Sequence, residues 1–178
     1  ELLKALGDFI LEIKLSNEGS QEVFVNGYDI TNAIRSPQVT AQVSIIAAKG
    51  SVREKLTAEQ KELGRKGGLV AEGRDIGTQV FPDAELKVFL TASTQERARR
   101  RAKDLEENGF EVPNLLDLEK QIRDRDLRDS SREIAPLIKA ENAKELITDG
   151  MTKQEVIDCL VKIFREEIPE EIWPLTIN

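Results

Sequence analysis

The 178-residue sequence contains no histidine and a single cysteine, Cys159. Without histidine, the Ser-His-Asp and Cys-His catalytic arrangements are excluded. One thiol cannot form an internal disulfide, and it cannot join histidines in a metal cluster. Any proton transfer must therefore use Asp, Glu, Lys or Tyr side chains.

Long apolar runs and excess positive charge are also lacking. No apolar stretch approaches the roughly 18–20 residues of a transmembrane helix, and no signal-peptide core is present. Lys and Arg number 26 against 33 Asp and Glu, which gives a net charge of −7 and argues against a general nucleic-acid binder. We expect a monomer without nucleic-acid or membrane partners, in the cytoplasm or an organellar stroma.

The first fifty residues predict a small antiparallel sheet. Residue 1 is Glu and residues 1–7 resemble the end of a helix, so we expect the chain to start within a domain. Residues 9–15 alternate as a strand does, and residues 22–25 form a second strand before Asn26-Gly27, a strong hairpin signal. One or two short helices should follow between residues 30 and 48.

From residue 51 onward, helices alternate with strands. Ser93 with Glu96 and Thr152 with Glu155 have capping-box spacing at two helix starts. This order predicts an α/β fold with a parallel sheet, in which residues 9–30 are an insertion. The expected helices cover 51–63, 94–107, 115–131 and 152–167, and the expected strands cover 69–71, 87–92 and 143–148.

The glycine-flanked pair Arg74-Asp75 follows the first of these strands. Ligands of open α/β sheets bind outside the carboxyl ends of the strands. Arg74 suits a phosphate, and Asp75 can accept from an exocyclic amine or a hydroxyl. Gly73 and Gly77 allow a ligand to approach the backbone closely. A surface ion pair is the competing interpretation.

Two arginine-rich helices follow. Arg125, Asp129 and Arg132 lie at i, i+4 and i+7 and could hold a phosphate and a ribose hydroxyl. A second group lies on one face of the other helix and consists of Arg97, Arg100 and Arg101. Its positive charge suits a polyphosphate. Solvated faces with internal ion pairs, or for the second group a nucleic-acid arm, are the alternatives.

Three segments closely resemble the bacterial-type cytidylate (CMP/dCMP) kinase family: residues 69–92, residues 96–101, and residues 125–132 followed by Ala135-Pro136-Leu137. The resemblance implies the α/β fold of P-loop nucleoside monophosphate kinases, a parallel sheet flanked by helices with a small antiparallel insertion. It divides the chain into a monophosphate-binding and insertion region, residues 1–53, and a kinase core, residues 54–178, with a lid around 102–124.

The resemblance also implies transfer of the ATP γ-phosphoryl group to CMP or dCMP, with Mg²⁺ carried mainly by phosphates and water and no metal ligand in the chain. The cytosine ring would be recognised by Ser44, Arg53 and Asp75. The CMP phosphate would be held by Arg74 and Arg132, the ribose by Asp129, and both sugar and phosphate by Arg125. The lid arginines that stabilise the transferred phosphoryl group would be Arg97, Arg100 and Arg101.

The family's phosphate loop, Gly-x-x-x-x-Gly-Lys-Ser/Thr, does not occur in these residues. We expect the first strand and this loop to lie upstream. A non-catalytic nucleotide-binding module or subunit is the alternative, and a kinase of UMP or AMP is a weaker one.

Overall fold

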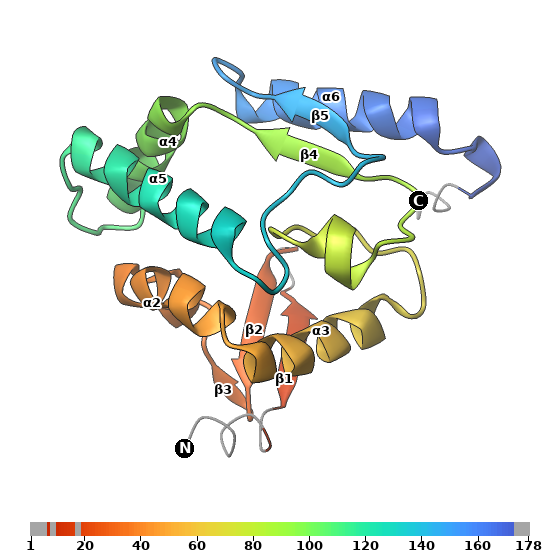
Figure 1. The fold of residues 1–178 in the computed structure, drawn as a ribbon, viewed down its shortest axis with the longest axis horizontal. Helices are drawn as coiled ribbons and strands as arrows, with labels where there is room; N and C mark the ends of the chain where they lie inside the picture. The colour runs from red at the N-terminus through yellow and green to blue at the C-terminus, as the bar shows by residue number, and fades with distance from the viewer. Residues whose placement is uncertain (1–6, 8–9, 17–18, 173–178) are drawn as a thin grey trace. The chain divides into compact units, whose positions relative to one another are not determined.

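The computed structural model describes residue 7 and residues 10–16 and 19–172 (Figure 1). The chain divides into two compact units, Glu1–Glu62 and Leu63–Asn178. The predicted end of a helix at residues 1–7 falls almost entirely outside the described residues. The predicted boundary between functional regions at residue 53 stays a prediction.

The first unit contains the predicted antiparallel sheet, with strand order β1-β2-β3. Strands β1 (Leu11–Leu15) and β2 (Gln21–Val25) pair along their whole lengths, and β3 (Tyr28–Asp29) adds to β2. Asn26 and Gly27 have φ angles of 51° and 81°. Two successive positive φ angles are what a two-residue hairpin turn requires, so the sequence signal is confirmed.

Two helices and a short turn complete the first unit. The 3₁₀ turn η1 (Ala33–Arg35) leads into α2 (Pro37–Ala47), which is followed by α3 (Gly50–Gly64). The Ser36 side chain accepts a hydrogen bond from the backbone N–H of Val39 at 3.4 Å, and Pro37 begins the helix. A serine cap followed by proline is a common helix start. The expected short helices between residues 30 and 48 are therefore present.

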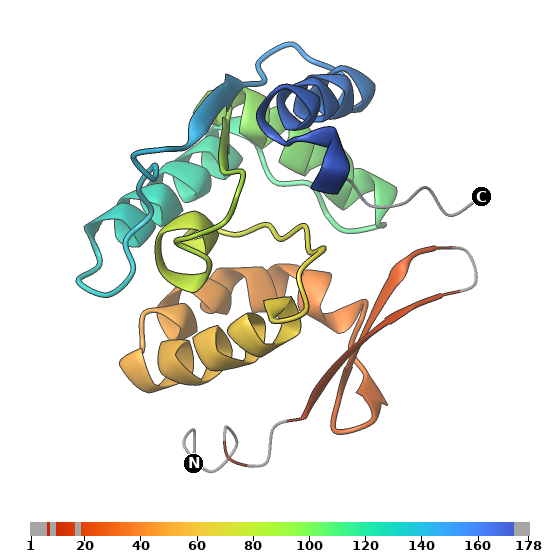
Figure 2. The same cartoon turned by 90° about the vertical axis from the view of Figure 1, so that its right-hand side faces the viewer.

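The second unit is built around a parallel pair of strands, β4 (Val88–Thr91) and β5 (Lys144–Ile147). Helices α4 (Thr94–Glu107) and α5 (Leu115–Ser131) connect them, and α6 (Lys153–Glu167) follows β5 (Figures 1 and 2). A 3₁₀ turn, η3 (Glu170–Ile172), comes next. The parallel pairing and all three helices confirm the α/β prediction.

Helices α4 and α5 share an apolar core. Ala98, Leu105 and Leu118 are almost completely buried there, and Ala102, Phe110 and Ile122 pack against them. Polar contacts accompany this core, because Thr94 donates to Glu119 at 3.1 Å and Arg97 lies 2.6 Å from Asp126. This packing fixes where the arginines of both helices lie.

The two predicted capping boxes have different outcomes. At α6, Thr152 and Glu155 make both reciprocal hydrogen bonds. At α4, the Ser93 side chain accepts from the backbone N–H of Glu96, but the backbone N–H of Ser93 donates to Asp149 at 2.9 Å. The second box is therefore only half formed, because a carboxylate distant in sequence takes the position predicted for Glu96.

The strand predicted over residues 69–71 is not formed. Leu69 is 49% exposed and Val70 is fully exposed. A strand exists only where a neighbour supplies ladder hydrogen bonds, and within the described residues β4 pairs with β5 alone. After this segment comes a short π-helical turn, η2 (Ile76–Val80), which buries Val80.

No helix in the described ranges is long and apolar enough to cross a membrane.

Candidate functional site

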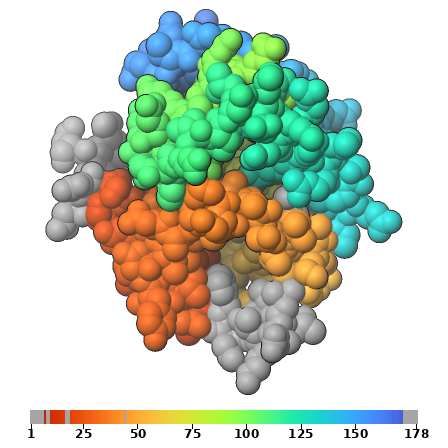
Figure 3. Space-filling view, turned by 90° about the vertical axis from the view of Figure 1, so that its left-hand side faces the viewer, coloured from red at the N-terminus to blue at the C-terminus, as the bar shows by residue number. Residues whose placement is uncertain are grey.

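Six charged side chains meet in the second unit, and we call them the arginine–aspartate cluster. Arg74 comes from the loop before η2, Arg97 from α4, and the others from α5 and the residue that ends it: Arg125, Asp126, Asp129 and Arg132. Helices α4 and α5 lie side by side on the face seen in Figure 3. Four guanidinium groups against two carboxylates leave an excess of two positive charges.

Asp129 is the buried centre of the cluster, with 3% of its side chain exposed. Its Oδ2 atom lies 2.7 Å from Nε of Arg74 and 3.7 Å from Nε of Arg125, and its Oδ1 atom lies 3.5 Å from Nη1 of Arg132. A negative charge this deeply buried is costly unless opposite charges lie close to it. The structure therefore brings together Arg125, Asp129 and Arg132, as their helical spacing predicts.

Asp126 was not identified from the sequence. Its Oδ1 atom lies 3.4 Å from Nη1 of Arg74, and its Oδ2 atom lies 2.6 Å from Nη1 of Arg97. The carboxylate thus bridges guanidinium groups from two different elements. Its position three residues before Asp129, on the same face of α5, is the signal that could have revealed it.

Arg132 is held by the chain that follows α5. Its side chain is only 9% exposed, and its Nε atom donates to the carbonyl of Ala135 at 2.6 Å. Ala135 has a φ angle of 50°, which a non-glycine residue rarely adopts. The backbone N–H of Leu137 then donates to the Asp129 carbonyl at 2.8 Å. This turn ties Arg132 and Asp129 to one local structure.

The cluster has the electrostatic character of an anion site. Burial, followed by repulsion from Arg74, lowers the pKa of Arg125, although an arginine remains charged at any physiological pH. The buried Nε of Arg125 makes no hydrogen bond within the described part of the chain. A phosphate oxygen would supply the hydrogen-bond acceptor that this Nε atom lacks beside its 3.7 Å ion pair with Asp129.

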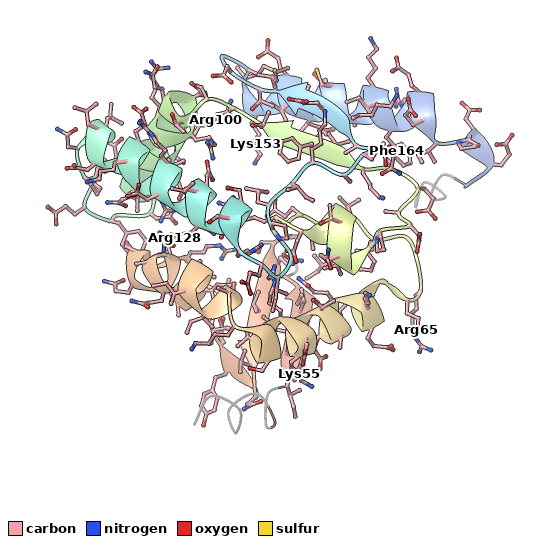
Figure 4. All side chains as sticks on the ribbon, viewed as in Figure 1. Lys55, Arg65, Arg100, Arg128, Lys153 and Phe164 are labelled. Atoms are coloured by element: carbon pink, nitrogen blue, oxygen red, sulfur yellow. The ribbon has the colours of Figure 1, made fainter. Side chains whose placement is uncertain are left out.

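The three arginines predicted as a group on α4 have separate partners. Arg97 joins the cluster and also donates from Nε to the carbonyl of Ala92 at 3.1 Å. Arg100 lies beside the ends of the strands (Figure 4), where it contacts Glu96 at 2.9 Å and donates to the hydroxyl and carbonyl of Thr148. Arg101 pairs with Asp104 at 2.6 Å. Only Arg97 of the three contacts the cluster.

The residues predicted to recognise a base lie in both units. Asp75 is half-buried, and its carbonyl accepts the backbone N–H of Gln79 at 2.9 Å, which starts η2. Arg53 on α3 donates from Nη1 to the carbonyl of Ala47 at the end of α2, at 3.3 Å. Ser44 is on α2, and its side chain lies outside the described residues.

The donor set of the cluster fits an anion rather than a metal ion. Both carboxylates already contact guanidinium groups, which would repel a divalent cation. Elsewhere in the described ranges, no group of three or more Cys, Asp or Glu side chains could hold a metal.

Guanidinium groups gathered between a helix and a loop of an α/β unit have donor geometry that suits phosphate groups. The chain belongs to the cytidylate kinase family, because the model of that family, described as cytidylate kinase, matches residues 3–166. The resemblance found in the sequence is thus confirmed, and so is the α/β fold class with its parallel and small antiparallel sheets.

Relatives of high identity are named bifunctional pantoate ligase/cytidylate kinase. One from Prochlorococcus marinus is 67% identical over 174 residues, which cover 98% of this chain and 34% of that protein. One from a Synechococcus species is 60% identical over 169 residues, which cover 95% of this chain and 35% of that protein. The chain spans about a third of the length of these curated relatives.

Proposed function

We propose that the protein containing this chain transfers the γ-phosphoryl group of ATP to CMP or dCMP. The observation that supports it is the arginine–aspartate cluster, a half-buried site with two excess positive charges in a member of the cytidylate kinase family. In the reaction, an oxygen of the CMP phosphate bonds to the γ-phosphorus of ATP. The bond from that phosphorus to the β–γ bridging oxygen breaks, which leaves CDP and ADP.

Positioning and electrostatics would supply most of the catalysis, because the attacking phosphate oxygen is already a nucleophile and needs no general base. In this proposal Arg74 and Arg132 hold the acceptor phosphate, Arg125 spans phosphate and sugar, and Asp129 binds ribose hydroxyls. The excess charge of the cluster and the buried Nε of Arg125 support these assignments.

Base recognition is assigned to Ser44, Arg53 and Asp75. The Asp75 carboxylate would accept a hydrogen bond from the exocyclic amine of cytosine, which uracil lacks. A polar contact of this kind discriminates strongly, because the wrong base leaves the carboxylate unpaired.

Arg97, Arg100 and Arg101 are assigned to stabilisation of the transferred phosphoryl group. The contact of Arg97 with the cluster favours it most among the three. Mg²⁺ would be carried by the ATP phosphates and by water, since the chain offers no acidic cage for it within its described residues.

The names of the relatives suggest a wider context. We propose that this chain is the kinase part of a longer polypeptide that also carries a pantoate ligase part, as in the Prochlorococcus and Synechococcus relatives. The predicted monomeric state stays a prediction.

The test is ATP- and Mg²⁺-dependent formation of CDP from CMP by the longest natural polypeptide that carries this sequence, with UMP and AMP alongside. We expect CDP to form with at least a tenfold preference in kcat/KM over the other acceptors. An Arg132→Ala variant should raise the KM for CMP, whereas Asp124→Asn, an exposed change on α5, should not. CMP binding without turnover would favour a nucleotide-binding module, and a preference for UMP or AMP would contradict the choice of acceptor.

A further inference from the structure

Asp126 has contacts that none of the proposed substrate roles explains. The proposed function assigns it no contact with the base, sugar or phosphate of the nucleotide. Each of its carboxylate oxygens nevertheless contacts a different arginine. Its side chain is 25% exposed, so solvent only partly screens these charges. The two arginines belong to separate elements, and the carboxylate connects them.

Each of the two arginines is also held by a second contact. Arg74 contacts Asp129 through Nε at 2.7 Å, and Arg97 donates to the Ala92 carbonyl just beyond β4 at 3.1 Å. With Asp126 on a terminal nitrogen of each, both guanidinium planes are fixed at two points. A guanidinium carries five N–H donors, more than these contacts use, so each arginine retains donors for a ligand.

We infer that Asp126 is a positioning residue that sets the separation of the Arg74 and Arg97 guanidinium groups for a phosphate-bearing nucleotide. This inference rests on the proposed function, because the two arginines that Asp126 would position are assigned there to phosphate groups. Asp126 itself would not touch the substrate. Its carboxylate would keep two like charges close together before the nucleotide arrives.

Charge and positioning predict opposite results when Asp126 is neutralised. If only net charge matters, Asp126→Asn removes a negative charge from an anion site and CMP should bind more tightly. If Asp126 positions the arginines, the amide can accept from only one of them, and its NH₂ group faces the other. CMP should then bind more weakly even though the site has become more positive.

The experiment compares CMP with cytidine, which differ only by the phosphate, by titration calorimetry on the full polypeptide. For Asp126→Asn we expect CMP affinity to fall about tenfold, as for loss of a charged hydrogen bond, while cytidine affinity changes less than twofold. Asp124→Asn is the matched control, because it makes the same change on the same helix at an exposed position. It should leave both affinities unchanged.

A second variant and a kinetic readout separate positioning from folding. Asp126→Glu keeps the carboxylate but moves it by one methylene, so we expect a loss of CMP affinity smaller than that of Asp126→Asn. If Asp126→Asn does not fold, Asp126→Glu provides the test of positioning. In turnover, Asp126→Asn should lower kcat together with affinity, because Arg97 is assigned to the transferred phosphoryl group. A purely structural role would lower the melting temperature and affect cytidine and CMP equally.

The outcomes separate the inference from the proposed function. If the unmodified protein prefers CMP to cytidine and Asp126→Asn binds CMP equally or more tightly, the inference is overturned and the function stands. If both ligands lose affinity equally, the inference is overturned as well. If the unmodified protein does not distinguish CMP from cytidine, the proposed phosphate site is wrong, and the role of Asp126 falls with it.

Discussion

At the scale of single residues, the site depends on how two carboxylates divide four guanidinium groups. Asp129 is buried and contacts three of them, and Asp126 is partly exposed and contacts two. Arg74 is the guanidinium that both carboxylates share. Asp75 follows it directly, so the residue proposed to hold phosphate and the residue proposed to recognise the base are neighbours in the chain.

A residue-scale prediction concerns Asp75→Ala. If its carboxylate recognises the amine of cytosine, its removal should cost the protein about 1–3 kcal/mol of preference for CMP over UMP, roughly a 5- to 160-fold change in the ratio of kcat/KM values. Absolute affinity for the phosphate should change much less. The measurement is steady-state kinetics with both nucleotides, and an equal loss for both would contradict base recognition by Asp75.

At the scale of elements, the start of α4 and the end of β5 are joined by a polar junction. Asp149 accepts the backbone N–H of Ser93, and Arg100 donates to Thr148, which is 1% exposed. The negative charge of Asp149 also lies at a helix N-terminus, where it is favourable. The junction fixes α4 against the parallel strand pair, and therefore fixes Arg97.

This junction should make stability depend on pH. Hydrogen bonding from Ser93, with a smaller contribution from Arg100, lowers the pKa of Asp149. A carboxylate with a lowered pKa stabilises the fold above its unfolded pKa, about 3.9, and loses that contribution as the pH falls through its folded value. We expect Asp149→Asn to melt a few degrees below the unmodified protein at pH 7, with the gap closing below about pH 4. Asp124→Asn should show no gap, and a gap that persists in acid would contradict this account.

The elements also show which features a sequence can specify. The helix over 115–131, the Asn26-Gly27 turn and the Thr152–Glu155 box were predicted correctly because neighbouring residues determine them. The segment 69–71 was wrongly predicted as a strand, because its apolar pattern does not supply a pairing partner. The Ser93–Glu96 box is only half formed because Asp149, 56 residues away, takes part.

The candidate site also combines features set by neighbouring residues with features set by residues distant in sequence. The helical spacing of Arg125, Asp129 and Arg132 was sufficient to group them. The recruitment of Arg74 and Arg97, and the bridge through Asp126, depend on packing between elements that no local pattern contains. Proximity along α4 did not reveal the partners of Arg100 and Arg101, whose side chains contact Thr148, just after β5, and Asp104 on α4 itself.

At the scale of the whole molecule, the positive cluster is an exception on an acidic protein. The net charge is −7 and the isoelectric point is near 4.9. Two excess positive charges are enough to bind the phosphate of a mononucleotide, but they are too few to neutralise the many phosphates along a duplex.

This contrast predicts selectivity for small phosphate esters. We expect no binding to duplex DNA or RNA in low-salt fluorescence anisotropy, where electrostatic attraction is strongest, while CMP binds under the same conditions. Tight, salt-sensitive duplex binding would contradict the charge argument and favour the alternative of a nucleic-acid arm on α4.

The fixed arginines also determine when conformational freedom is lost. An arginine side chain gives up as much as about 2 kcal/mol of rotamer entropy when it is immobilised. In the cluster, Asp126, Asp129 and the carbonyls of Ala92 and Ala135 already restrain these side chains. That entropy is therefore lost when the chain folds, and a nucleotide that enters the site meets side chains with little left to lose.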